Sequence, residues 1–117
     1  MRRRLLGTGT ALVAAGSLVT VLASTGIAQD AKAAYDKNCA TCHGAGGKGD
    51  GAAAKVLKPP PTDFATALKG KSDADIAKAI KDGGKAVGKA ASMPAYGAKM
   101  NDEQIQGLVQ YVKGLAK

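Results

Sequence analysis

Residues 39–43 read Cys39-Ala40-Thr41-Cys42-His43, and this pentapeptide decides how the rest of the chain is interpreted. On one turn of helix, Cys39 and Cys42 are neighbours at i and i+3, and His43 follows Cys39 at i+4 on the same side. Two thiols and one imidazole can therefore bind the same ligand. The chain contains 2 Cys and 1 His in all, so the motif holds every one of them.

This spacing is the one used to attach c-type haem, because two thiols can reach the vinyl groups along one porphyrin edge while the imidazole faces the iron. Three other interpretations are weaker. A disulfide across two residues closes a small loop and adds little stability. A thioredoxin-like site needs a strand–helix context, and a zinc site needs a fourth strong ligand. We therefore predict one haem c, bound covalently by Cys39 and Cys42, with His43 as an axial iron ligand.

The composition also points to a group that completes the core. From residue 29 onward the chain has 89 residues, and only 12 of them are Leu, Ile, Val or Phe. This fraction, about 13%, lies below the roughly 20% under which chains tend to be disordered. A haem is a large apolar disc around which such a chain can condense.

Residues 1–28 are predicted to be a cleaved signal peptide. Three arginines follow Met1, a charge-free apolar stretch comes next, and Gly26-Ile27-Ala28 resembles a cleavage site. The predicted domain is then 29–117, and its location is the periplasm. The alternative is an uncleaved membrane anchor, because the charge-free stretch is long enough to span a bilayer.

The remaining sequence predicts an all-α domain with long loops. No segment shows the alternation of a strand, and the glycines and prolines of residues 44–61 predict a loop. Asn101 with Gln104, and Ser72 with Asp75, have the spacing of helix N-terminal capping boxes. The expected helices are residues 30–38, a brief turn capped at 62–63 and ending at 68, a helix from 72 that stops at Gly83-Gly84, and a final helix after 101.

These segments together resemble the bacterial class I c-type cytochromes, small single-haem electron carriers. The resemblance covers nearly all of residues 30–117 and rests on Tyr35, CATCHG, GKGDG, KPPPTDF, SMPAYG and a closing amphipathic helix with Tyr111. It implies the class I cytochrome c fold, in which three to five short helices and long loops wrap around one covalently bound haem. The first and last helices are expected to cross, and Tyr111 is expected among the cofactor-binding residues.

The second axial ligand must be Met93 or Met100 if Met1 is removed with the signal. Met93 precedes Pro94, which favours an extended backbone from which a side chain can reach across a cleft. Met100 has a structural explanation, since it precedes the cap Asn101 and can pack onto Ile105. The ligand in the resembled family also lies in a Met-Pro pair, so we expect Met93.

The proline run has an expected role as well. A metal-bound histidine usually donates its other ring N–H to a carbonyl. The resemblance implies that this acceptor lies in residues 59–61, and we expect Pro59. The alternative is a stiff polyproline linker without a partner.

Ligands on both sides of the iron leave no position for a substrate, and methionine ligation suits moderate-potential electron exchange. We therefore predict a carrier and not an enzyme, cycling Fe(III)/Fe(II) between periplasmic or membrane redox partners. The alternative is a cytochrome c subunit of a dehydrogenase or oxidase complex. A haem peroxidase would need further catalytic His or Arg residues, and a haem-based sensor would need a labile Met93.

The charge of the predicted domain indicates its partners. It has 14 lysines, no arginine and 9 acids, a net +5. With no arginine and only 4 aromatics it lacks the usual tools for reading nucleic acid, and neither nucleic acid nor a small-molecule substrate is expected. We expect a monomer whose redox partners have acidic docking surfaces. The lysines of the connecting segments are candidates for that contact: Lys48, Lys55, Lys58, Lys89 and Lys99.

Overall fold

The computed structural model describes residues 24–117, together with residues 9, 11, 15 and 16. Every regular element of this part is helical, which confirms the predicted all-α fold. No helix in it is long and apolar enough to cross a membrane. The elements are α1 (Ser24–Asn38), α2 (Ala40–His43), the 3-10 turn η1 (Ala52–Val56), α3 (Phe64–Ala67), α4 (Asp73–Asp82), the 3-10 turn η2 (Lys85–Val87) and α5 (Asp102–Leu115).

Most of the predicted signal peptide lies outside the described residues. The first helix is longer than the predicted 30–38, because α1 already begins at Ser24 and runs through the predicted cleavage position after Ala28. No proline interrupts this stretch, so the backbone can continue as a helix. Cleavage after Ala28 stays a prediction.

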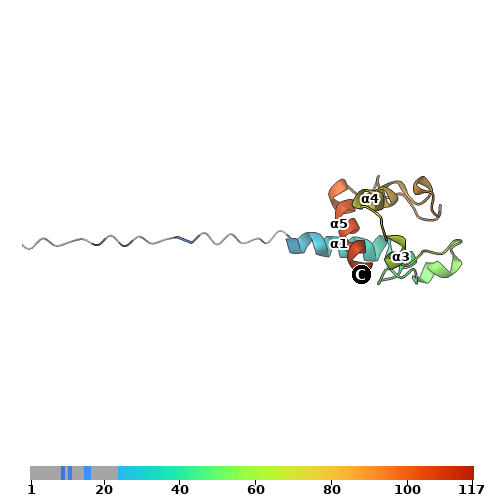
Figure 1. Ribbon diagram of the computed structural model, residues 1–117, viewed down its shortest axis with the longest axis horizontal. Coiled ribbons are helices and arrows are strands. Elements are labelled where there is room, and N and C mark those ends of the chain that lie inside the picture. Colours follow the sequence, from blue (N-terminus) through green and yellow to red (C-terminus); the bar gives the residue numbers. More distant parts are fainter. Residues whose placement is uncertain (1–8, 10, 12–14, 17–23) are drawn as a thin grey trace, which may run out of the picture.

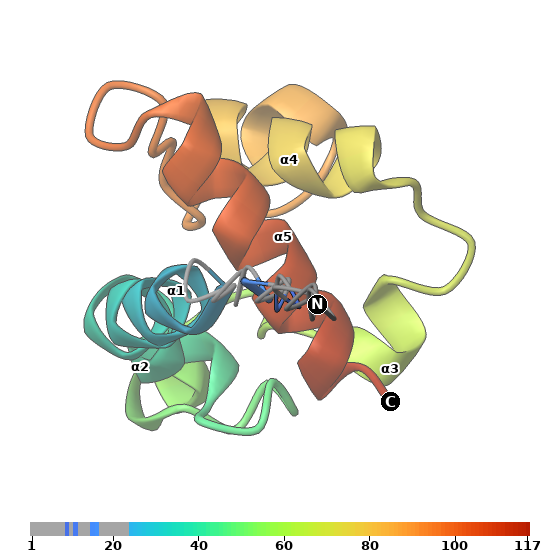
Figure 2. The same ribbon diagram turned by 90° about the vertical axis from the view of Figure 1, so that its left-hand side faces the viewer.

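The first and last helices cross, as expected (Figure 2). Small residues form the crossing: a Cβ placed on Gly107 would lie 3.6 Å from the Cβ of Ala31. That distance is ordinary contact, so the crossing has room for a methyl group there but not for a large side chain. The close approach lets α5 bury Leu108 and Val109 completely against α1 and α4.

The predicted caps are present. Asn101 and Gln104 form a capping box at the start of α5, and Ser72 and Asp75 form one at the start of α4. Gly83 ends α4 with a positive φ of 85°, a conformation that suits glycine. The helices α4 and α5 thus begin where their sequences indicate, and each turns its apolar stripe inward. The buried stripe residues are Ile76, Ile80, Ile105, Leu108, Val109 and Val112.

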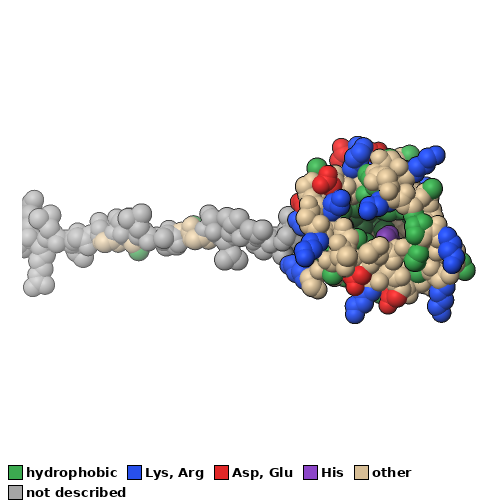
Figure 3. All heavy atoms as spheres, turned by 45° about the vertical axis from the view of Figure 1, so that its right-hand side comes forward, with side chains coloured by type: hydrophobic (Ala, Val, Ile, Leu, Met, Phe, Trp, Pro, Cys, Tyr) green, Lys and Arg blue, Asp and Glu red, His purple; other side chains and the backbone are tan. Residues whose placement is uncertain are grey.

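The long segments between the helices form the other side of the molecule. Figure 1 shows the segment between α2 and α3 below and the segment after α4 above, at the end remote from the start of α1. The predicted loop 44–61 contains one 3-10 turn, η1, which begins with three successive alanines directly after the glycine-rich stretch. The space-filling view shows a hollow on this side, with the chain's single histidine at its floor (Figure 3).

Candidate functional site

The CATCH motif is built as a helical turn that directly follows α1. The Cys39 N–H donates to the Tyr35 carbonyl at 2.8 Å, and the His43 N–H donates to the Cys39 carbonyl at 2.9 Å. The second bond places His43 one turn after Cys39, which is the geometry expected from the spacing. Both thiols are free and half-buried, and burial, followed by the nearby Cys42, raises the pKa of Cys39 to about 11.

The glycine-rich loop after the motif binds the backbone of the motif through hydrogen bonds. The Gly49 N–H donates to the His43 carbonyl at 2.8 Å, and the Gly51 N–H donates to the Cys42 carbonyl at 3.2 Å. A side chain on Gly51 would collide with the carbonyl of Thr41. The loop therefore needs glycine at 51 so that its backbone can approach the motif closely.

The His43 side chain is half-buried next to the two cysteines. Its ring lies against Phe64, with 4.9 Å between ring centroids, and burial lowers its pKa. Its Nδ1 is buried and makes no hydrogen bond within the described part of the chain. A buried ring nitrogen without a partner is costly in an ordinary core. A neutral imidazole beside two free thiols fits the donor set of covalent haem attachment, and we find no conflict with that group.

The rest of the described chain gives no competing metal site. Residues 24–117 contain no cluster of three or more His, Cys, Asp or Glu side chains able to hold an ion. The zinc interpretation therefore gains no further ligands from the fold.

Met93 lies in the segment that follows α4, and backbone hydrogen bonds fix its position. The Gly84 N–H donates to the Met93 carbonyl at 3.1 Å, and the Met93 N–H donates to Ala90 at 3.2 Å. A side chain on Gly84 would collide with the Ala90 carbonyl. Met93 itself is half-buried and packs against the core.

One tyrosine connects this segment to the motif. Tyr96, three residues after Met93, donates its hydroxyl to the Asn38 carbonyl at 2.9 Å. Its own N–H donates to the Ile80 carbonyl at 3.0 Å. Tyr96 thus links the segment carrying Met93 to the residue immediately before Cys39, across 58 positions of sequence.

Met100 has the structural position that its sequence indicates. It is half-buried, packs against the core and precedes the cap Asn101. Its N–H donates to the Tyr96 carbonyl at 3.0 Å. The assignment of the axial ligand to Met93 stays a prediction.

The proline run contacts the glycine-rich loop through Pro61. Pro59 is exposed, and the buried His43 Nδ1 forms no hydrogen bond with it. The Pro61 carbonyl lies against the loop, where a side chain on Gly49 would collide with it. The pairing of His43 with Pro59 stays a prediction.

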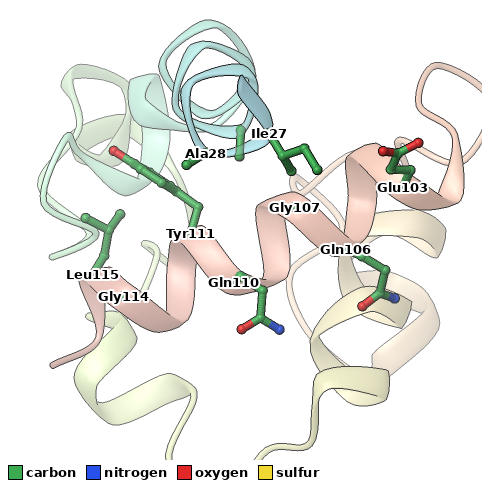
Figure 4. A pocket seen from close by; sticks show the side chains of 10 residues that line it. Ile27, Ala28, Glu103, Gln106, Gly107, Gln110, Tyr111, Gly114 and Leu115 are labelled. Carbon is green, nitrogen blue, oxygen red and sulfur yellow. The ribbon is translucent and has the colours of Figure 1, made fainter. Parts of the chain in front are cut away.

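Tyr111 lies on α5 beside α1. Its ring centroid is 5.1 Å from that of Tyr35, and Tyr35 donates its buried hydroxyl to the Gly44 carbonyl at 2.6 Å. Tyr111 also lines an apolar groove of about 650 Å³ between the two helices, together with Ile27 and Gly107 (Figure 4). Tyr111 therefore packs against Tyr35, whose hydroxyl binds the residue that directly follows the motif. The contact of Tyr111 with a cofactor stays a prediction.

Sequence reasoning gave no role to two aromatic residues that build the site, Phe64 and Tyr96. A signal for them was present, because the chain has only 3 Tyr and 1 Phe. All four lie in segments that carry the resemblance, and all four surround the motif or fix the Met93 segment. The scarcity of aromatic residues could therefore have indicated a structural role for Phe64 and Tyr96.

The hydroxyl hydrogen bonds of Tyr35 and Tyr96 give a first prediction. We expect Tyr35→Phe to lower the free energy of unfolding of the holoprotein by about 1–2 kcal/mol, since it removes a buried hydrogen bond and leaves the Gly44 carbonyl with only its bond from the Gly47 N–H at 3.1 Å. Tyr96→Phe should cost about 1 kcal/mol because its site is less enclosed. Urea denaturation of the two variants measures both effects.

Tyr111→Phe is the matched control, since its hydroxyl makes no hydrogen bond among the described residues, and it should change stability by less than about 0.5 kcal/mol. Equal losses in all three variants would show that the hydroxyl bonds contribute nothing specific.

A small all-helical domain with a CATCH turn at the floor of a hollow is a class I c-type cytochrome. The chain belongs to the family described as cytochrome c oxidase, cbb3-type, subunit III, which matches residues 26–112. It is 33% identical over 88 residues to the cbb3-type cytochrome c oxidase subunit CcoP of Azospirillum brasilense. It is 34% identical over 102 residues to CcoP of Azospirillum sp. (strain B510).

These matches cover 75% and 81% of the chain but 28% and 33% of the two relatives, so the chain spans about a third of their length or less. Both relatives are named as subunits of an oxidase. The comparisons therefore favour our alternative, a cytochrome c subunit of an oxidase complex, over a free carrier.

Proposed function

We propose that this chain is the electron-transferring cytochrome of an oxidase complex and is not itself catalytic. The observation that carries the proposal is the His43 turn: a half-buried imidazole whose buried Nδ1 has no partner in the described chain, one turn from a free Cys39 and next to a free Cys42, at the floor of a hollow. Cys39 and Cys42 would hold one haem c, and His43 and Met93 would be its axial ligands. A bound haem supplies one-electron exchange between Fe(III) and Fe(II).

The protein's own residues keep these groups in place. Phe64 packs against the imidazole ring and limits its rotation, while the glycine-rich loop holds the backbone of His43. Tyr96 fixes the Met93 segment relative to the motif. An electron carrier benefits from such rigidity, because its ligands should move little between the two oxidation states.

The proposed location is the periplasm, after removal of residues 1–28. An uncleaved N-terminal segment that anchors the domain to the membrane is the alternative. The intact mass of the holoprotein purified from detergent-solubilised whole cells tests this proposal, since it should equal residues 29–117 plus one haem. A mass that retains residues 1–28 would support the anchor.

The lysines of the connecting segments are available to a partner. Five of them are exposed, and none forms an ion pair within 4 Å in residues 24–117: Lys48, Lys55, Lys58, Lys89 and Lys99. Figure 3 shows basic side chains around the hollow. Flexible ammonium groups suit contacts that must form and break quickly. We propose that they meet an acidic surface on a redox protein, and that the domain itself is a monomer.

Salt dependence tests this proposal. Charge contacts at a surface are screened over about 8 Å at physiological ionic strength. We therefore expect the bimolecular rate of electron transfer from the reduced holoprotein to the oxidase to fall by about tenfold between low and high salt. Stopped-flow oxidation measures the rate, and an acidic acceptor should react faster than a basic one of equal driving force.

A rate that stays flat or rises with salt would contradict an acidic docking surface. It would indicate apolar docking, or electrons that never leave a permanent complex. A protein without the absorption spectrum of a c-type haem would contradict the proposed function itself.

A further inference from the structure

A single hydrogen bond joins the part of the domain that carries the CATCH motif to the part that carries Met93. We call residues 24–71 the motif half and residues 72–117 the Met93 half. The Tyr96 hydroxyl donates to the Asn38 carbonyl at 2.9 Å. In the described part of the chain, no other hydrogen bond crosses from one half to the other. No ion pair within 4 Å crosses between these described residues either.

Each half is well connected within itself. In the motif half, the Gly49 N–H donates to the His43 carbonyl at 2.8 Å, and the Phe64 N–H donates to the Gly47 carbonyl at 2.8 Å. The motif, its glycine-rich loop and the start of α3 are therefore bound together by backbone hydrogen bonds.

The Met93 half is bound together in the same way. The Tyr96 N–H donates to the Ile80 carbonyl at 3.0 Å, and the Gly97 N–H donates to the Lys81 carbonyl at 2.9 Å. Both acceptors lie in α4, so the segment that follows Met93 is attached to that helix. None of these bonds depends on the motif half.

The other contacts between the halves are apolar. The core cluster combines Tyr35 and Phe64 of the motif half with Ile76, Ile80 and other side chains of the Met93 half. Apolar packing is non-directional, so it holds the halves together without fixing their exact spacing. A hydrogen bond has a preferred length and direction, and can fix that spacing.

The position of this bond matters for the site. Asn38 directly precedes Cys39, and its carbonyl lies at the end of α1, where helix carbonyls lack a partner within the helix. Tyr96 is 9% exposed and lies three residues after Met93. Figure 1 shows the segment after α4 and the segment between α2 and α3 on opposite sides, and the bond spans from one half to the other.

We propose that Tyr96 is a positioning residue for the sixth iron ligand. Its hydroxyl bond to Asn38 would fix the spacing of the two halves and so keep the Met93 thioether within reach of an iron held by the motif. Without the bond, the Met93 half could shift on its apolar contacts, and the thioether would be displaced more easily. The inference rests on the proposed function, because it concerns the ligand set of the same site.

The test measures how easily an added ligand displaces the thioether. The oxidised Tyr96→Phe holoprotein is titrated with imidazole, a neutral ligand whose approach the surrounding lysines affect little, and loss of the far-red band reports displacement. We expect the apparent dissociation constant of imidazole to fall by about fivefold relative to the wild type, the factor expected for loss of one hydrogen bond.

Two control variants separate positioning from general stability. Tyr35→Phe removes a hydroxyl bond of 2.6 Å that lies entirely within the motif half, and Tyr111→Phe removes a hydroxyl without a hydrogen bond in the described chain. Both should change the imidazole affinity by less than twofold, although Tyr35→Phe loses at least as much stability as Tyr96→Phe. On heating, only Tyr96→Phe should lose the far-red band further below the melting of its helices than the wild type does.

The inference is wrong if Tyr96→Phe binds imidazole within twofold of the wild type. It is also wrong if Tyr35→Phe raises the affinity as much, since general destabilisation then explains the effect. Either result, obtained with a normal c-type haem spectrum in the wild type, leaves the proposed function standing. A wild-type protein without that spectrum contradicts the proposed function, and the inference with it.

Discussion

Replacing Cys39 and Cys42 together by alanine is expected to remove nearly all folded protein from the periplasm. The domain's core cluster contains only nine buried side chains, and three of these are aromatic residues that surround the motif. Burial on this scale offsets little of the entropy lost by fixing a chain of this length. A covalently attached haem would supply the missing apolar contact, so preventing its attachment should remove more than the chain can replace.

The expected effect is large. Domains are stable by about 5–15 kcal/mol, and the double variant should lose essentially all of it. The measurements are the yield of haem-containing protein from a periplasmic extract and the far-ultraviolet circular dichroism of the purified chain. Thr41→Ala, an exposed position inside the same turn, is the control and should accumulate like the wild type.

The same loss of folded structure is expected for the wild-type chain when its cofactor is removed. Chemically prepared haem-free protein should likewise have little helix and no cooperative thermal transition. Native-like helical circular dichroism with a sharp melting transition would falsify it, and would show that the aromatic core suffices without haem.

The elements that sequence reasoning predicted well are those fixed by local chemistry. The capping boxes of α4 and α5 depend on residues three positions apart, and both were found where the spacing placed them. The turn from Cys39 to His43 is equally local. Such features need no knowledge of the rest of the fold, because the interacting groups are neighbours along the chain.

Long-range contacts could not be predicted in the same way. Tyr96 meets the Asn38 carbonyl across 58 positions, and nothing near either residue indicates the other. The approach of the Pro61 carbonyl to Gly49 depends on the path of a loop that has no periodic pattern. The start of α1 differed for another reason: residues 24–28 were assigned to a signal peptide, although their sequence is compatible with a helix.

Replacing Met93 by alanine is expected to change the iron site while leaving the fold intact. The segment around Met93 is held by backbone hydrogen bonds from Gly84 and by Tyr96, and these bonds do not involve the Met93 side chain. The loop should therefore keep its place when the thioether is removed. What would disappear is the proposed soft thioether ligand, which would raise the reduction potential.

We expect three changes in the Met93→Ala holoprotein. The far-red absorption band of the oxidised form should be lost, and added azide or cyanide should bind. The reduction potential should fall by on the order of 100 mV, since axial ligands set haem potentials over a range of about 0.8 V. Spectroscopy, ligand titration and voltammetry measure these effects separately.

Met100→Ala is the matched control, because Met100 is also half-buried and lies seven positions further along the chain. Its side chain packs against the core beside the cap of α5, so its removal should cost about 1–2 kcal/mol of stability. The spectrum and the potential should stay unchanged. If the far-red band is lost in Met100→Ala and kept in Met93→Ala, the axial ligand is Met100, and the backbone bonds that fix the Met93 segment serve packing alone.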